Sequence, residues 1–311
     1  MKKLLIFGAA GFVGPYLAKE FIKSGYEIYA TDIVDEENDL YKKFFKVDIL
    51  DKEAVCNLIE AVNPTHIVNL AAISSVGVSW KIPDKTMSIN INGTINILEA
   101  CIRSKIKPRV LLIGSSEEYS NSLTPIDEKN PIDATNPYGI SKVAQEQLAK
   151  IYRKKYNWKI FCVRSFNHIG IGQKTTFVIP SWCNQVAKIE KGIESPTINV
   201  GNLNVSRDFS SVKDIVNAYK MIIESDKEDE IYNIGQGKAY LLKDILNYVI
   251  SLSSKKIDIN IDSSLIRSND NSIICCNNRK IRDEIGWVPK IDVYDEIKQI
   301  YEDMLYEKNT D

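Results

Sequence analysis

Short apolar runs alternate with amphipathic segments through the first half of the chain. The runs lie at residues 4–7, 28–31, 45–47, 67–70, 110–113 and 160–163. Between them, apolar side chains recur every three or four positions, as in Val13, Leu17 and Phe21. Continuous apolar strands separated by amphipathic helices are typical of a parallel sheet covered by helices on both faces. We therefore expect an α/β fold with a doubly wound parallel sheet of the Rossmann type.

Three glycines occupy the junction between the first apolar run and the first amphipathic segment. They are Gly8, Gly11 and Gly14, with Phe12 and Val13 between them. Glycine at this place permits a tight turn, a close backbone approach to a pyrophosphate and close packing of helix on strand. The N-terminus of the following helix offers free N–H groups to the phosphates. Because the trio lies between a strand and a helix, it predicts a dinucleotide cofactor.

Asp32 ends the second expected strand and is the candidate ligand for the adenine ribose of the cofactor. A carboxylate there accepts hydrogen bonds from both ribose hydroxyls of NAD and repels the 2′-phosphate of NADP. The alternative is a solvated turn aspartate, but its spacing from the glycines favours the ribose. NAD(H) is therefore favoured, and NADP(H) is the alternative cofactor. The other expected cofactor contacts are Asp48, Ile49, Leu70, Ala71, Ala72 and Asn90.

The alternation breaks down after about residue 166, where prolines, glycines and a polar run produce shorter, irregular elements. Later segments again have a recognisable period. They predict a helix over 208–223, a strand over 230–234 and a helix over 241–251. We expect a dinucleotide-binding domain and a smaller, mixed α/β substrate domain. The first comprises residues 1–166 and 208–234, and the second comprises residues 167–207 and 235–311.

The composition excludes several classes of protein. Forty basic and 41 acidic residues leave a net charge of −1, so no global basic field indicates a nucleic-acid partner. No apolar run reaches the ~18 residues that a membrane-spanning helix needs. The six cysteines form no C-x-x-C pair and the two histidines lie far apart, so we expect no metal site. Reduced thiols in a cytoplasmic protein are the simpler interpretation.

The segment 136–142 (NPYGISK) is the most informative about chemistry. Asn136 can cap a helix, so Tyr138 and Lys142 are expected one turn apart on the same face. An ammonium there, together with the charge of an oxidised nicotinamide, stabilises the tyrosine phenolate. Tyr138 can then exchange a proton with a sugar oxygen while hydride moves on the cofactor. Ser115 ends the fifth expected strand, where its hydroxyl can orient that oxygen.

With these residues in place, the chain resembles the extended short-chain dehydrogenase/reductases that act on nucleotide sugars. Within that family it is most similar to the GDP-6-deoxy-4-keto-D-mannose reductases, which form GDP-rhamnose. The resemblance covers nearly the whole chain and is carried by the segments 114–119 (GSSEEY), 138–142 (YGISK), 164–170 (RSFNHIG), 200–203 (VGNL), 207–209 (RDF) and 286–289 (GWVP). It implies an NAD(P)-dependent oxidoreductase in which Ser115, Tyr138 and Lys142 are catalytic.

The resemblance also implies a substrate site. Asn167, Arg207 and Arg267 match positions that hold the nucleotide diphosphate, and arginine forks suit its oxygens. The alternative for Arg207 is a surface ion pair with Asp208. The other expected substrate contacts are Ser75, Ser116 and Glu117. The chain departs from the family pattern at Ser120, Ile171, Ser211 and Ser268, and these departures bear on the identity of the base and the sugar.

Several reactions could use this set of residues. We expect NAD(P)H-dependent reduction of the 4-keto group of a GDP-4-keto-6-deoxy-hexose, giving GDP-rhamnose, because segments 114–119 and 164–170 side with the reductases. The alternatives are a GDP-mannose 4,6-dehydratase, in which Glu117 would take the C5 proton, and a nucleotide-sugar epimerase. A non-catalytic cofactor-binding scaffold would be expected to lose Tyr138 or Lys142, and both are present.

The resemblance predicts a homodimer as well. The helices expected around 90–103 and 138–152 resemble those that pair family members in a four-helix interface.

Overall fold

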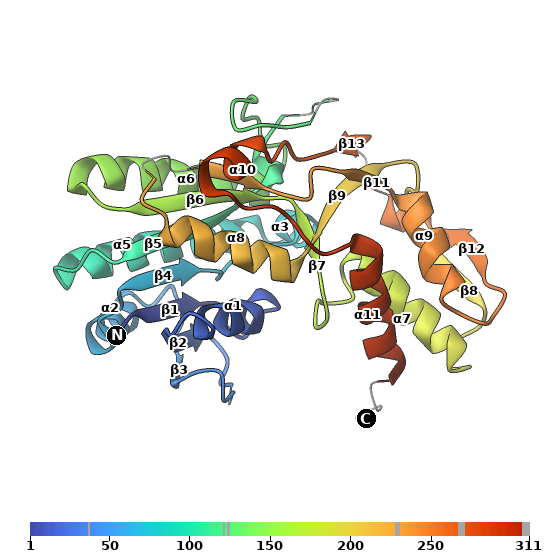
Figure 1. Ribbon diagram of the computed structural model, residues 1–311, viewed down its shortest axis with the longest axis horizontal. Helices are drawn as coiled ribbons and strands as arrows, with labels where there is room; N and C mark the ends of the chain where they lie inside the picture. Colours follow the sequence, from blue (N-terminus) through green and yellow to red (C-terminus); the bar gives the residue numbers. More distant parts are fainter. Residues whose placement is uncertain (37, 121, 123–124, 228–230, 267–270, 307–311) are drawn as a thin grey trace.

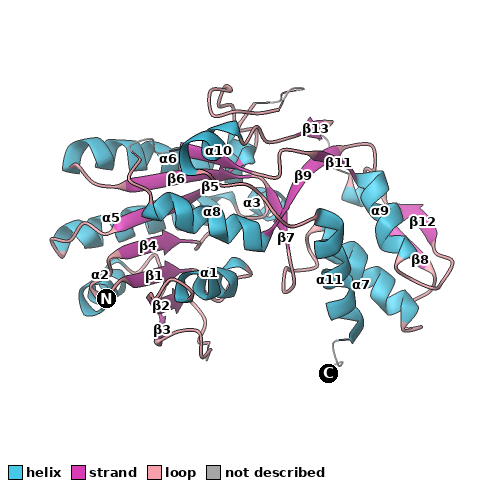
Figure 2. Ribbon diagram, in the orientation of Figure 1, coloured by secondary structure: helices cyan, strands magenta, loops and turns pink. Residues whose placement is uncertain are grey.

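Seven parallel strands form the central sheet in the computed structural model (Figures 1 and 2). Their order across the sheet is β10 (Ile231–Ile234), β6 (Ile160–Ser165), β5 (Arg109–Ser115), β4 (His66–Asn69), β1 (Lys3–Phe7), β2 (Glu27–Asp32) and β3 (Lys43–Lys46). The structure describes residues 1–36, 38–120, 122, 125–227, 231–266 and 271–306. The six strands expected from the first half of the sequence are β1 to β6, so the doubly wound α/β fold is confirmed.

Helices cover both faces of this sheet because strand residues alternate between two apolar cores. Leu4 and Ile6 of β1 belong to the core on one face, and Leu5 and Phe7 belong to the core on the other. The first face is covered by α1 (Val13–Ile22) and α8 (Val212–Glu224). The second is covered by α2 (Lys52–Val62), α5 (Gly93–Arg103) and α6 (Pro137–Tyr156). Burial on both faces explains why the strands read as continuous apolar runs.

The second half of the chain has a core of its own, around Trp182, Phe209 and Ile297. The helices that enclose it are α7 (Val178–Glu190), α9 (Leu242–Ser251) and α11 (Val293–Tyr306). A mixed sheet joins β7 (Asn167–Ile169), β9 (Ser206–Ser211), β11 (Ala239–Leu241) and β13 (Ile273–Ile274), and β8 (Thr197–Val200) pairs with β12 (Asp258–Ile261). This body lies beyond the ends of the central strands (Figure 1). The domain boundaries proposed from the sequence stay predictions.

Short helical elements complete the fold. They are α3 (Val76–Lys81), α4 (Pro83–Met87), the π-helical turn η1 (Ser88–Asn92), the 3₁₀ turns η2 (Ser116–Glu118) and η3 (Ser263–Leu265), and α10 (Arg279–Ile285).

The prediction of a helix over 208–223 was wrong at its N-terminal end. Residues Ser206–Ser211 form β9, and the helix α8 begins only at Val212, with Ser211 as its cap. The buried Asp208 side chain accepts hydrogen bonds from the backbone N–H groups of Gln236, Gly237 and Cys276. A polar residue satisfied in this way can lie in the middle of a buried strand. The other two elements expected in this half, at 230–234 and 241–251, correspond to β10 and α9.

All six cysteines are buried free thiols. Among the described residues, no group of three His, Cys, Asp or Glu side chains is arranged to hold a metal ion. Within the same residues, no helix has both the length and the apolar composition that crossing a bilayer requires.

Candidate active site

The junction of β1 and α1 leaves no room for side chains at two glycines, one in the turn and one at the start of the helix. Gly8 has a φ of +77°, and a Cβ there would lie 2.5 Å from the backbone nitrogen of Ala71. A Cβ on Gly14 would overlap the carbonyl of Ala9. The two glycines therefore allow the close approach of backbone segments that a pyrophosphate-binding turn requires. Gly11 and Phe12 complete the turn, and Val13 begins α1.

Asp32, the last residue of β2, is bonded to the same turn. Its Oδ2 accepts a hydrogen bond from the Ala10 N–H at 3.1 Å, and its Oδ1 accepts one from the Ile33 N–H at 2.7 Å. The side chain is half-buried. The carboxylate is therefore fixed beside the glycine turn, where the expected ribose would lie.

The other cofactor candidates fall into two groups. Asp48 follows β3 and is exposed. Leu70, Ala71 and Ala72 follow β4 and are half-buried, so all four lie at the surface or close to it. Ile49 is buried in the core behind α2 and α5. Asn90 is also buried, and its amide bonds both backbone groups of Ile73 and the Ser141 hydroxyl. The structure thus gives Ile49 and Asn90 a supporting position beneath the site.

Ser115, Tyr138 and Lys142 converge at the carboxyl end of β5. Ser115 is the last residue of that strand, and its side chain hydrogen-bonds Tyr138. Asn136 caps α6 as expected, because its Oδ1 accepts the Gly139 N–H at 2.9 Å. Lys142 Nζ lies 5.7 Å from the centroid of the Tyr138 ring. All three side chains are buried, which strengthens any electrostatic interaction between them.

Burial is the largest influence on the pKa of both titratable groups in this trio. It raises the pKa of the Tyr138 hydroxyl, against which the bond from Ser115 works, and the charges of Glu118 and Glu117 raise that pKa further. Burial lowers the pKa of Lys142 to about 8, opposed chiefly by the charge of Glu118. Protein groups alone therefore do not produce the lowered tyrosine pKa expected from the sequence.

A buried carboxyl group that sequence reasoning missed lies behind Ser115. Glu118 is 1% exposed, and its Oε1 accepts the Ser115 N–H at 2.8 Å. Its Oε2 lies 3.7 Å from Nε of Arg164, whose guanidinium makes two hydrogen bonds to Glu146 at 2.7 and 2.9 Å. Burial and the charge of Glu146 raise the pKa of Glu118. A Cβ on Gly114 would overlap Glu118 Oε1, so that glycine makes the space for the carboxyl group.

Two substrate candidates directly follow Ser115, and a third follows the neighbouring strand β4. Ser116 and Glu117 belong to η2, directly after Ser115, and both are half-buried. Glu117 Oε2 accepts a hydrogen bond from Asn136 Nδ2 at 2.8 Å. Ser75 follows the neighbouring strand β4 and caps α3 by accepting the N–H of Val78.

The other substrate candidates come from the second half of the chain. Asn167 is exposed at the start of β7, which pairs with β9. Arg207 on β9 donates to the backbone carbonyls of Ser206 at 2.8 Å and Asn271 at 2.7 Å. Arg267 lies outside the described residues.

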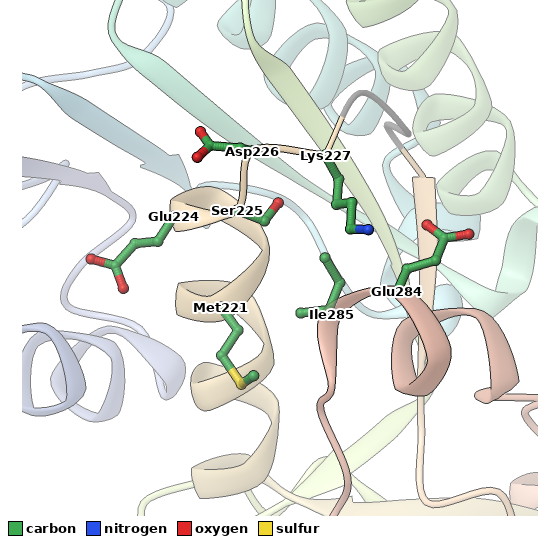
Figure 3. Close-up of a pocket in the computed structure, with 7 residues that line it drawn as sticks. All are labelled: Met221, Glu224, Ser225, Asp226, Lys227, Glu284 and Ile285. Atoms are coloured by element: carbon green, nitrogen blue, oxygen red, sulfur yellow. The ribbon is translucent and has the colours of Figure 1, made fainter.

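A depression of about 540 Å³ lies elsewhere, beside the C-terminal end of α8 (Figure 3). Its lining includes Glu224 and Asp226, which approach Lys2 and Arg109 at the amino ends of β1 and β5. Ser115 stands at the carboxyl end of β5. In open α/β sheets, ligands bind at the carboxyl ends of the strands, so this depression is not the candidate active site.

A glycine turn on the first strand and a Ser–Tyr–Lys trio on a doubly wound sheet define an NAD(P)-dependent enzyme of the extended short-chain dehydrogenase/reductase class. The family model described as GDP-mannose 4,6 dehydratase matches residues 5–300. The chain belongs to that family.

Relatives named for different reactions match more than nine tenths of the chain. It is 27% identical to the GDP-6-deoxy-D-mannose reductase of Pseudomonas aeruginosa, over 97% of both chains. It is 26% identical to the UDP-glucose 4-epimerase of Bacillus subtilis, over 92% of each. The structure of RMD from Pseudomonas aeruginosa, complexed with NADPH, matches it with a TM-score of 0.86 at 25% identity, over 98% of this chain and 99% of that one. The chain is accordingly an NAD(P)-dependent nucleotide-sugar enzyme.

Proposed function

We propose that the protein reduces the 4-keto group of a GDP-4-keto-6-deoxy-hexose with NAD(P)H and forms GDP-rhamnose. The observation that carries this proposal is the similarity to a GDP-6-deoxy-D-mannose reductase along 97% of both chains. The buried Ser115, Tyr138 and Lys142 trio supplies the groups that such a reduction needs.

Each member of the trio has its own task in this proposal. The glycine turn after β1 fits a dinucleotide, which when bound supplies the hydride for C4. Tyr138 donates its hydroxyl proton to the oxygen at C4, and Ser115 holds that oxygen by a hydrogen bond. Lys142 places a positive charge beside the phenolate that Tyr138 becomes once it has given up its proton. Asn167, Arg207 and Arg267 are the proposed ligands of the nucleotide diphosphate, and Ser75, Ser116 and Glu117 those of the sugar.

Redox stoichiometry tests the reaction type. The reductase should oxidise one NADH or NADPH for each GDP-4-keto-6-deoxymannose consumed and leave GDP-mannose unchanged. The second candidate is the dehydratase, favoured by the description of the matching family model. A dehydratase would convert GDP-mannose to a keto-sugar with no net consumption of reduced cofactor. Conversion of GDP-mannose by the purified protein, abolished in Glu117→Gln, would decide for the dehydratase.

We infer that Asp32 makes NAD(H) the preferred cofactor. Hydrogen bonds from two backbone N–H groups hold its carboxylate at the end of β2, where a 2′-phosphate would meet a negative charge. Asp32→Ala should lower the ratio of kcat/KM for NADH to that for NADPH by about tenfold. Asp32→Asn, which keeps an acceptor for the Ala10 N–H, should change the ratio similarly with a smaller loss of total activity. An unchanged ratio in both variants would show that Asp32 does not face the ribose.

We also infer a homodimer that pairs α5 and α6 with their copies. Ile140 and Ile151 are 47% and 58% exposed on α6, and their spacing of three helical turns places them on one face. Light scattering at micromolar concentration should give the mass of a dimer, and Ile151→Asp should reduce it to that of a monomer.

Because all six cysteines are free buried thiols, we expect a reducing, cytoplasmic environment.

A further inference from the structure

One side chain joins the candidate base Glu117 to the helix that carries Tyr138. Asn136 is 5% exposed and immediately precedes α6. Its Oδ1 accepts a hydrogen bond from the Gly139 N–H at 2.9 Å, and its Nδ2 donates to Glu117 Oε2 at 2.8 Å. A carboxylate can only accept and a backbone N–H can only donate, so these two partners fix the orientation of the amide. Asn136 therefore has two separate functions, as a helix cap and as a donor to Glu117.

The backbone around this contact has little freedom. A Cβ on Gly139 would overlap the carbonyl of Glu117 and lie 3.0 Å from the Cβ of Ala134, so η2 rests directly on the first turn of α6. The Glu117 N–H donates to Ser115 Oγ at 3.2 Å. Glu117 is thus held at its backbone by Ser115 and at its carboxylate by Asn136.

The bond to the carboxylate has a chemical consequence. The hydrogen bond from Asn136 Nδ2 occupies Glu117 Oε2 and ties the carboxylate to the start of α6, whereas a general base needs a free oxygen within reach of the proton that it abstracts. Acting as a base on a 4-keto sugar, Glu117 would take the C5 proton as the C5–H bond breaks and an O–H bond forms. The electron pair of the broken bond would move into an enolate on the C4 oxygen.

We propose that Asn136 is a positioning residue that restrains Glu117, and so favours hydride transfer to C4 over removal of the C5 proton. This inference rests on the proposed function, which makes a 4-keto sugar the substrate. It also gives Asn136 a part in reaction specificity that its role as a helix cap does not require.

Hydrogen exchange at C5 tests this proposal. The protein with NAD⁺ is incubated in D₂O with GDP-4-keto-6-deoxymannose, and deuterium at C5 is followed by NMR. Asn136→Ser keeps a good helix cap but lacks the amide donor. Asn136→Asp keeps the acceptor for the Gly139 N–H and places a second carboxylate opposite Glu117. We expect exchange about fivefold faster than wild type in Asn136→Ser and faster still in Asn136→Asp.

A gain in exchange cannot come from a poorly folded variant, because loss of structure would slow it. Exchange no faster than wild type in both variants overturns the proposal. So does faster exchange that survives in the double variant Asn136→Ser with Glu117→Gln, since the base would then be another group. Failure of the proposed reductase function is read separately, from wild-type protein that oxidises neither NADH nor NADPH with this sugar.

Discussion

Removing one oxygen atom tests the proposed proton donor. Tyr138→Phe should fold normally and lose about two to four orders of magnitude in kcat, the usual contribution of general acid–base catalysis. Tyr119→Phe is a matched control, because the hydroxyl of Tyr119 is also buried but bonds Arg164 and Asn233. The control should lower the Tm and leave kcat close to that of the wild type. Activity of Tyr138→Phe within a few-fold of wild type would remove Tyr138 from the mechanism.

Glu118 should influence the pH at which Lys142 loses its charge. Burial lowers the pKa of Lys142 to about 8, and the negative charge of Glu118 raises it. Glu118→Gln keeps an oxygen for the Ser115 N–H and removes the charge, so the pKa of Lys142 should fall. Lys142 would then become neutral at a lower pH. We expect the alkaline decrease in kcat/KM to begin at a lower pH than in wild type, and a pH profile measures it.

Glu146→Gln is the control for that profile. The charges of Glu146, Arg164 and Lys142 act on the pKa of Glu118, and Cys162 acts together with Glu118 on the pKa of Lys142. The charge of Glu146 raises the pKa of Glu118, so its removal leaves Glu118 more fully ionised and Lys142 better stabilised. The alkaline decrease should therefore stay in place or move to higher pH. If the alkaline decrease in kcat/KM began at an equally lowered pH in both variants, a specific effect of Glu118 would be contradicted.

The candidate catalytic residues were accessible from the sequence, because the spacing of Tyr138 and Lys142 on one helix face is a local property. Glu118 was not. Its burial depends on the absent side chain of Gly114 and on Arg164 from the neighbouring strand β6. A glutamate beside Glu117 in a polar segment reads as solvated until the packing of that strand is known. The same limit applies to Asn136, whose contact with Glu117 joins two segments separated in sequence.

At the scale of elements, the close packing of α1 against the end of β1 predicts that a larger side chain at this contact weakens cofactor binding. A Cβ on Gly14 would overlap the Ala9 carbonyl, so Gly14→Ala should push the N-terminus of α1 away from the turn and raise the Kd for NADH by about tenfold. Gly77→Ala in α3 is the control, because its Cβ would meet nothing closer than 4.0 Å. Fluorescence titration with NADH compares the two. Equal affinities would show that the turn tolerates the displacement.

The β9 segment shows where element prediction fails. Residues 208–211 carry the polar sequence DFSS, which has no strand-like alternation. They are nevertheless buried in β9, where Asp208 pairs with β11 and the next three residues pair with β7. These partners are distant in sequence, and a local period cannot report them. The strands of the central sheet were easier, because burial by helices on both faces gives each of them a continuous apolar sequence.

At the scale of the molecule, Trp287 anchors the segment after α10 to the core between the central sheet and helices α1 and α8. It is 1% exposed, packs in the core shared by α1 and α8, and donates its ring N–H to the Asp214 carbonyl at 3.1 Å. Trp287→Ala should lower the free energy of unfolding by about 3–5 kcal/mol, the usual cost of an emptied aromatic site. Trp80→Ala, at a side chain 63% exposed, should change it by less than ~0.5 kcal/mol. Urea unfolding followed by circular dichroism compares the two, and similar losses would contradict this anchoring.

The order of strands across the central sheet has a consequence for synthesis on the ribosome. All six residues of β6 are buried, and β10 is its outer neighbour in the finished sheet. The ribosome translates β10 only after β7, α7, β8, β9 and α8. During that interval the nascent β6 has an open edge of unpaired N–H and C=O groups beside apolar side chains, which is a template for aggregation. We therefore expect chaperones to bind nascent chains most strongly between the emergence of β6 and that of β10.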